Sequence, residues 1–117
     1  MFESLKNSRE FRFVYQNGKS YANRYLVMYV AKNCLKKNRL GISVSKKVGN
    51  SVKRHRIIRL IRESFRLHKE ELSKGQTGND IVVIARVAAK GKGYKEIESA
   101  CLHLARLHGL FDNRTGR

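Results

Sequence analysis

The chain has 117 residues, enough for one domain but too few for two separate hydrophobic cores. Its 26 lysines and arginines against 9 acidic residues give a formal net charge of +17, which opposes compaction and indicates a polyanionic partner. No apolar run approaches the ~20 residues that cross a bilayer, and the N-terminus lacks a signal-peptide pattern, so we expect a cytoplasmic protein.

The first predicted elements in chain order are a short helix and an extended segment. Asn7 and Glu10 have the spacing of a capping box, and a helical apolar pattern follows, which predicts a helix from about Ser8 to Asn17. Gly18 suits the C-terminus of this helix. The stretch 21–31 is rich in tyrosine and valine and alternates with the period of a strand.

A polar hairpin loop over 33–38 and a second strand over 39–45 follow. One face of this second strand carries apolar side chains, and the other carries only small ones. The small face suits the close approach of another backbone or of a ligand. Its members are Gly41, Ser43 and Ser45.

The second half of the chain alternates helices with one buried strand. Ser51 is the expected cap of a long helix that runs to about Glu71, and 75–78 is a loop. The apolar run 80–85 predicts a central strand that is buried on both faces. A basic glycine loop over 90–93 then leads into a final helix from about Tyr94 to Gly109.

These elements predict one α+β domain over 1–117. We expect an ordered core from about residue 7 to 109 and a flexible C-terminal tail over 112–117.

The long helix has two chemically opposite faces. At 100° per residue, Ile57, Ile58, Ile61 and Phe65 share one arc. Nine lysines or arginines but a single glutamate lie between residues 46 and 69. A merely solvated face normally mixes signs at i,i+4, whereas this one repeats like charges and therefore indicates a binding face. The arc opposite the apolar one holds His55, Arg56, Arg59, Arg62, Arg66 and Lys69.

An anionic membrane surface is the other candidate partner for this charge. A membrane-surface helix needs Trp, Phe or Leu on its apolar face. The chain has no tryptophan, and its basic residues lie on segments that also carry a core pattern. The placement of the charge therefore favours nucleic acid and predicts no membrane partner.

The segments 40–50 and 52–63 closely resemble the protein component of bacterial ribonuclease P. That family carries Ser-Val-Ser-Lys-Lys and Gly-Asn-Ala-Val followed by an Arg-Asn-Arg box, and further likeness extends over about 7–107. Two positions depart from the family pattern. The central Asn of the box is His55 and a following Lys is Ile58, so it stays open whether His55 donates a hydrogen bond to RNA or only stacks on it.

The resemblance implies a fold similar to the second domain of ribosomal protein S5, in the order α-β-β-β-α-β-α with a left-handed β-α-β crossover. It also implies the function of a ribonuclease P subunit, which binds a catalytic RNA and the 5′ leader of precursor tRNA. The expected partners are ribonuclease P RNA and precursor tRNA, with no small-molecule substrate. Mg²⁺ would serve the holoenzyme and be bound mainly by RNA.

By the same resemblance, two sets of residues are expected to contact RNA. The catalytic RNA would be held by Lys46, Lys47, Lys53, Arg54, His55, Arg56, Arg59, Arg62 and Arg66. The leader would lie in a cleft formed by Arg9, Phe11, Tyr15, Arg24, Val27 and Tyr29. Aromatic rings stack on unpaired bases, but the alternative that these rings are ordinary core aromatics remains open.

No catalytic residue is predicted on the protein. Its carboxylates form no motif for a metal nuclease, and its histidines do not pair as acid and base. Cys34 and Cys101 are far apart in the sequence and are expected to be free thiols. Two alternatives to the ribonuclease P subunit remain: a structural, ribosomal-type RNA-binding protein, and a nuclease that acts without RNA.

Overall fold

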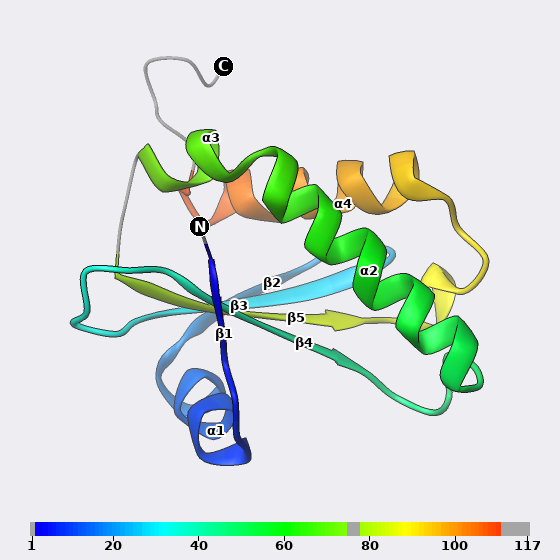
Figure 1. The fold of residues 1–117 in the computed structure, drawn as a ribbon, viewed down its shortest axis with the longest axis horizontal. Helices are drawn as coiled ribbons and strands as arrows, with labels where there is room; N and C mark the ends of the chain where they lie inside the picture. The colour runs from blue at the N-terminus through cyan, green and yellow to red at the C-terminus, as the bar shows by residue number, and fades with distance from the viewer. Residues whose placement is uncertain (1, 75–77, 111–117) are drawn as a thin grey trace.

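The computed structural model describes residues 2–74 and 78–110. In this part of the chain a five-stranded sheet carries one helix on one face and three helices on the other (Figure 1). A 3₁₀ turn follows the last strand at Val87–Ala89. In chain order the elements are β1 (Glu3–Ser4), α1 (Ser8–Asn17), β2 (Lys19–Ala22), β3 (Leu26–Lys32), β4 (Arg39–Val44), α2 (Ser51–Leu67), α3 (Lys69–Lys74), β5 (Asn79–Ala85) and α4 (Tyr94–Leu107).

The strands lie in the order β1-β4-β5-β3-β2. β4 is parallel to β5 and β1 is parallel to β4, while β3 is antiparallel to both β5 and β2. In Figure 1, β4 lies nearer the viewer than β5, and α2 runs back above them. The β4–α2–β5 crossover between these neighbouring parallel strands is therefore left-handed, as the resemblance predicted.

Two hydrophobic cores lie on opposite faces of the sheet. The larger one packs α2 and α4 against the sheet, with Leu26, Ile61 and Leu104 fully buried in it. The smaller one lies under α1 and centres on Val14 and Val82. Because β5 contributes to both cores, its apolar run is buried on both faces, which confirms the sequence prediction for this strand.

The order of elements agrees with the predicted α-β-β-β-α-β-α, and two elements are added to it. β1 and α3 were not predicted. The single strand-like stretch 21–31 is also wrong in detail, because β2 and β3 are separated by a tight hairpin. The Asn23 side-chain oxygen accepts the backbone N–H groups of Tyr25 and Leu26, at 3.2 and 3.0 Å, and so interrupts the strand.

The long helix differs from its prediction at both ends. Its cap is Asn50, whose side chain accepts the N–H of Lys53 at 3.0 Å, and Ser51 is the first helical residue instead. At the other end α2 stops at Leu67, and a turn at His68 leads into α3. The predicted tail 112–117 and loop positions 75–77 lie outside the described residues. Among those described, no helix combines the length and apolar character that a membrane span needs.

Candidate nucleic-acid interface

The basic face of α2 is held outward by the burial of its opposite face. Ile57, Ile61 and Phe65 are almost completely buried, whereas Ile58, placed in the same arc by the helical pattern, is only half-buried. The buried residues recur at i, i+4 and i+8, so the positions opposite them must face solvent. The exposed residues on that side are His55, Arg56, Arg59, Arg62 and Arg66, and Lys53 is exposed in the first turn of the helix.

Three of these arginines make contacts that fix their position. Arg56 donates to the backbone oxygen of Lys92 at 2.8 Å, and Arg62 donates to the Ser4 hydroxyl at 3.3 Å. Arg66 forms two hydrogen bonds with the carboxylate of Glu63, at 3.0 and 2.6 Å. This contact lowers the pKa of Glu63 and offsets the charge of Arg66. The net positive charge of the face is therefore greatest around Arg56 and Arg62.

The loop before α2 extends the basic face. Val48 is fully buried, and its N–H donates to the Ser45 carbonyl at 3.1 Å, so the turn is anchored in the larger core. Lys46 and Lys47 are exposed on this turn. Arg54 differs from its neighbours because it is half-buried, and its Nε is buried without a hydrogen-bond partner among the described residues.

Phe2 borders the other end of the basic face and was not predicted to do so. Its ring packs edge-on against Phe65, with centroids 5.3 Å apart. The two rings line a hollow of about 150 Å³ whose rim carries Arg62, Arg66 and Lys69. The N-terminal segment thus adds apolar surface beside the row of arginines, through long-range pairing that the sequence pattern does not reveal.

A second surface lies on the opposite face of the sheet, where α1 packs. This surface, here called the aromatic patch, consists of Phe11, Tyr15, Val27 and Tyr29, which lie on α1 and on the face of β3 that α1 covers. The rings of Tyr15 and Tyr29 meet edge-on with centroids 5.1 Å apart, and burial raises the pKa of Tyr15. Tyr15 is 39% exposed, and the other three are half-buried. The patch is therefore partly open to solvent, unlike the core around Val14.

The register of the strands extends this patch with Ser43, a member of the predicted small-residue face, and with Ile84, which the sequence did not single out. Val27 pairs with Ile84, and Ile84 pairs with Ser43 on the next strand. Ile84 and Ser43 are both half-buried. Together with Val27 they form a row across β3, β5 and β4 on the face that α1 covers, next to the row of Tyr29 and Val82.

Two arginines of the predicted cleft lie away from the four apolar residues. Arg9 lines a hollow with Phe13, Asn33 and Arg39 near the other side of α1. Arg24 lies at the β2–β3 hairpin, with its guanidinium carbon 5.8 Å from the ring centroid of Tyr25. The structure therefore brings together the apolar members of the cleft and places its two charged members at separate borders.

His68, at the turn between α2 and α3, has structural partners on both sides. His68 contacts Glu71 at 2.9 Å and Glu98 at 2.7 Å, between α2 and α4. In the part of the chain that the structure describes, no three His, Cys, Asp or Glu side chains gather closely enough to hold a metal ion.

Comparison with known proteins confirms the resemblance noted in the sequence. The family model described as Ribonuclease P matches residues 2–108. The ribonuclease P protein component of Lachnoclostridium phytofermentans is 64% identical over 113 residues, which cover 97% of this chain and 95% of that protein.

Two solved structures show the same likeness. The RNase P protein of Staphylococcus aureus superposes with a TM-score of 0.84 at 38% identity, covering 96% of this chain and 100% of that one. The RNase P protein of Thermotoga maritima gives a TM-score of 0.78 at 33% identity, covering 89% and 96%. The chain therefore belongs to the ribonuclease P protein family, the protein subunits of the ribonucleoprotein endoribonuclease that matures the 5′ ends of tRNA.

Proposed function

We propose that the basic face of α2 holds ribonuclease P RNA while the aromatic patch holds the 5′ leader of precursor tRNA. The observation that supports this assignment is the position of the two surfaces on opposite faces of one sheet (Figure 1). One RNA can occupy the arginine row without covering the patch under α1. The protein then acts as a bridge between catalytic RNA and substrate.

The chemistry of each surface suits its proposed ligand. Each guanidinium group can bind two phosphate oxygens at once. A row of such groups therefore suits a structured RNA whose phosphate backbone runs along α2. The partly open rings of Tyr15 and Tyr29 suit an unpaired strand, since stacking on aromatic faces requires no particular base sequence. A 5′ leader is such a strand. Arg9 and Arg24, at the borders of the patch, are proposed to contact its phosphates.

The bond-breaking groups are proposed to lie on the RNA. Mg²⁺ is strongly attracted to phosphates, so the catalytic ions of the holoenzyme are assigned mainly to RNA ligands. The protein is proposed to function in the cytoplasm as one RNA-binding domain.

A precursor-tRNA cleavage assay at low Mg²⁺ tests this function. The three arms are the protein alone, ribonuclease P RNA alone, and the two together. We expect efficient leader removal at low Mg²⁺ only in the mixture, because the protein increases the affinity for the substrate and neutralises the repulsion between phosphates.

Other outcomes of the same assay identify the alternatives. Cleavage by the protein alone would show a protein nuclease. Binding of ribonuclease P RNA without any gain in cleavage would favour a structural RNA-binding protein, for which the aromatic patch has no role.

A further inference from the structure

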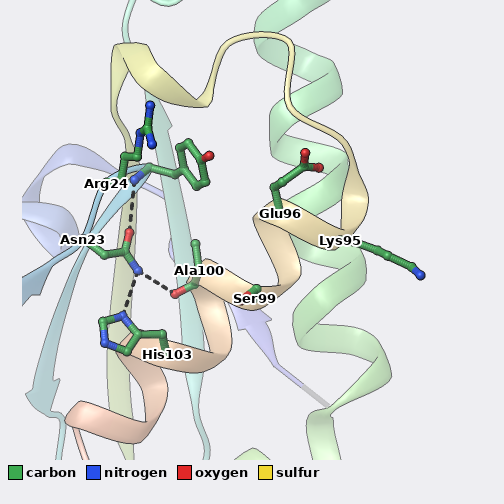
Figure 2. Close-up of a pocket in the computed structure, with 8 residues that line it drawn as sticks. Asn23, Arg24, Lys95, Glu96, Ser99, Ala100 and His103 are labelled. Carbon is green, nitrogen blue, oxygen red and sulfur yellow. Dashed lines mark hydrogen bonds between the residues drawn. The ribbon is translucent and has the colours of Figure 1, made fainter.

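A groove that shares only Arg24 with the surfaces described above lies between the β2–β3 hairpin and α4 (Figure 2). Its volume is about 490 Å³, within the range of sites that take small organic groups. Its lining includes Asn23, Arg24, Tyr25, Lys95, Ser99 and His103. We propose that this groove binds one unpaired nucleotide of an RNA strand, an inference that rests on the RNA-binding function proposed above.

Tyr25 is the stacking element of the groove. Its ring is half-buried and lies near two cations, the guanidinium of Arg24 and the ammonium of Lys92, at 5.8 and 5.6 Å from the ring centroid. A nucleotide whose base stacks on this ring would have two positive charges within reach of its phosphates. An aromatic ring flanked by cations is the combination that unpaired nucleic acid requires.

Hydrogen bonds fix the wall of the groove on the hairpin side. The Asn23 oxygen accepts two backbone N–H groups of its own turn, so the orientation of the amide is settled. Its Nδ2 therefore donates to the Ala100 carbonyl at 3.0 Å and to His103 Nδ1 at 3.2 Å (Figure 2). Because these bonds join the hairpin to α4, the groove is held open before any ligand binds.

The same bonds determine what His103 presents. Since Nδ1 accepts from Asn23, the proton of the neutral imidazole lies on Nε2. The His103 side chain is exposed, and this N–H points away from Asn23. It is available as a donor to an acceptor atom of a base, a 2′-hydroxyl or a phosphate.

The charge of the groove also favours an anion. Arg24, Lys92 and Lys95 supply positive charge at its borders. Among the described residues that line it the acid is Glu96, which accepts the backbone N–H of Gly93 at 3.0 Å and so caps the N-terminus of α4. This carboxylate is engaged with the helix end, where the helix dipole and the backbone offset its charge.

Lys92 joins the groove to the basic face of α2. Its backbone oxygen accepts the hydrogen bond from Arg56, while its side chain reaches the ring of Tyr25. An RNA strand that leaves the arginine row near Arg56 therefore meets the groove next. This continuity favours ribonuclease P RNA as the source of the nucleotide over the body of the tRNA.

Replacing Tyr25 by Trp gives a direct test, since the chain has no other tryptophan. The emission of this Tyr25→Trp variant is followed while ribonuclease P RNA or mature tRNA is added, and binding is measured separately with labelled RNA. We expect the emission to be quenched when ribonuclease P RNA binds. If only mature tRNA quenches it, the groove is still a nucleotide site, but its ligand is tRNA and the assignment to ribonuclease P RNA is overturned. Bound RNA with unchanged emission would overturn the groove while leaving the proposed function intact. If neither RNA binds, the proposed function fails and the groove with it.

Salt dependence gives a second, independent test. Tyr25→Leu should weaken RNA binding about tenfold with no change in the salt slope, because stacking is lost and no charge is removed. Lys95→Gln should lower the slope of log affinity against log salt by about 1. Lys36→Gln removes the same charge in the exposed loop between β3 and β4 and should leave the slope unchanged. Equal slopes for the two glutamine variants, or full affinity of Tyr25→Leu, would overturn the proposal.

Discussion

The ring of Phe11 lies directly against Gly41, the first residue of the small-residue face of β4. A methyl group at position 41 would lie 2.5 Å from Cζ of Phe11 and 2.8 Å from Cε2. No real side chain accepts such contacts, so the absence of a Cβ at this position sets how closely α1 approaches the sheet. The small face predicted from the sequence thus receives an aromatic ring.

Gly41→Ala should therefore displace Phe11 and destabilise the protein by about 1–3 kcal/mol. Because Phe11 belongs to the aromatic patch, we also expect a smaller preference for precursor tRNA over mature tRNA. Urea denaturation and the two binding affinities measure these effects. In the double variant Gly41→Ala/Phe11→Leu the smaller side chain relieves the clash, and stability should be partly restored. If the two changes are simply additive, the contact is not the cause.

Tyr29→Ala should weaken binding of precursor tRNA about tenfold while leaving mature tRNA unaffected, since it removes a stacking surface for the leader. Phe13→Ala is the matched control, because Phe13 is an exposed ring, 42% accessible, on the same helix as Tyr15 but outside the patch. An equal loss for precursor and mature tRNA would contradict leader binding at this surface.

Removing three charges from α2 should change the salt dependence of binding to ribonuclease P RNA. The variant replaces Arg56, Arg59 and Arg62 by Gln, and we expect the slope of log affinity against log salt to fall by about 2–3. Affinities measured at several salt concentrations give this slope. The control removes three exposed charges elsewhere, at Lys6, Lys32 and Lys36. A similar slope change in the control would mean that net charge, rather than this face, governs binding.

The contacts of His68 predict a pH dependence of stability. The pKa of His68 is raised above its usual value. The main cause is the hydrogen bond to the Glu98 carboxylate, and the hydrogen bond to the Glu71 carboxylate adds to it. Because the folded-state pKa is higher than the unfolded one, near 6.5, the stabilisation is complete below about pH 6.5 and is lost as pH rises through the folded pKa. The free energy of unfolding should fall over that range.

Urea denaturation across this pH range, on the protein and on His68→Gln, isolates the effect. The difference between the two curves is the quantity to measure, because His108 acts in the opposite direction. Burial lowers the pKa of His108, so its contribution is lost as pH falls. A pH-independent difference between the protein and His68→Gln would refute the role of His68.

A buried ion pair joins β4 to β5 and predicts a larger effect on stability. Arg39 donates to both oxygens of the fully buried Asp80, at 2.8 and 2.7 Å, and the hydrogen bond raises the pKa of Arg39. Asp80→Ala would leave a partly buried guanidinium without this partner and should cost about 3–5 kcal/mol in urea denaturation. Lys37→Gln, which removes an exposed pair with Glu3, should change stability by less than about 1 kcal/mol. Equal effects would exclude burial as the cause.

Local patterns in the sequence were enough to predict α1, α2, α4 and the basic face, but not the separate helix α3. The Asn7 side chain accepts the N–H of Glu10 at 2.9 Å, as the capping spacing indicated, although Glu10 turns back to the N–H of Lys6. The arginine row of α2 follows from helical periodicity alone, since its opposite face is uniformly apolar. These features depend on residues within one or two turns of each other.

The features that the sequence did not reveal depend on distant partners. β1 is two residues long, and its position is set by pairing with β4, which lies 36 residues later (Glu3 with Arg39). The break at Asn23 is reinforced by a bond to Ala100, 77 residues away. No local pattern encodes such relationships.

The central position of β5 has a consequence for the synthesis of this protein. Every other strand precedes β5 in the chain, and β5 lies between β3 and β4. Until residues 79–85 leave the ribosome, the β2–β3 hairpin and the β1–β4 pair are two unjoined halves with open edges. The nascent chain thus carries the complete arginine row of α2 before it has a sheet to support it, and the native sheet can form only after β5, which ends nearly three quarters of the way along the chain, has emerged.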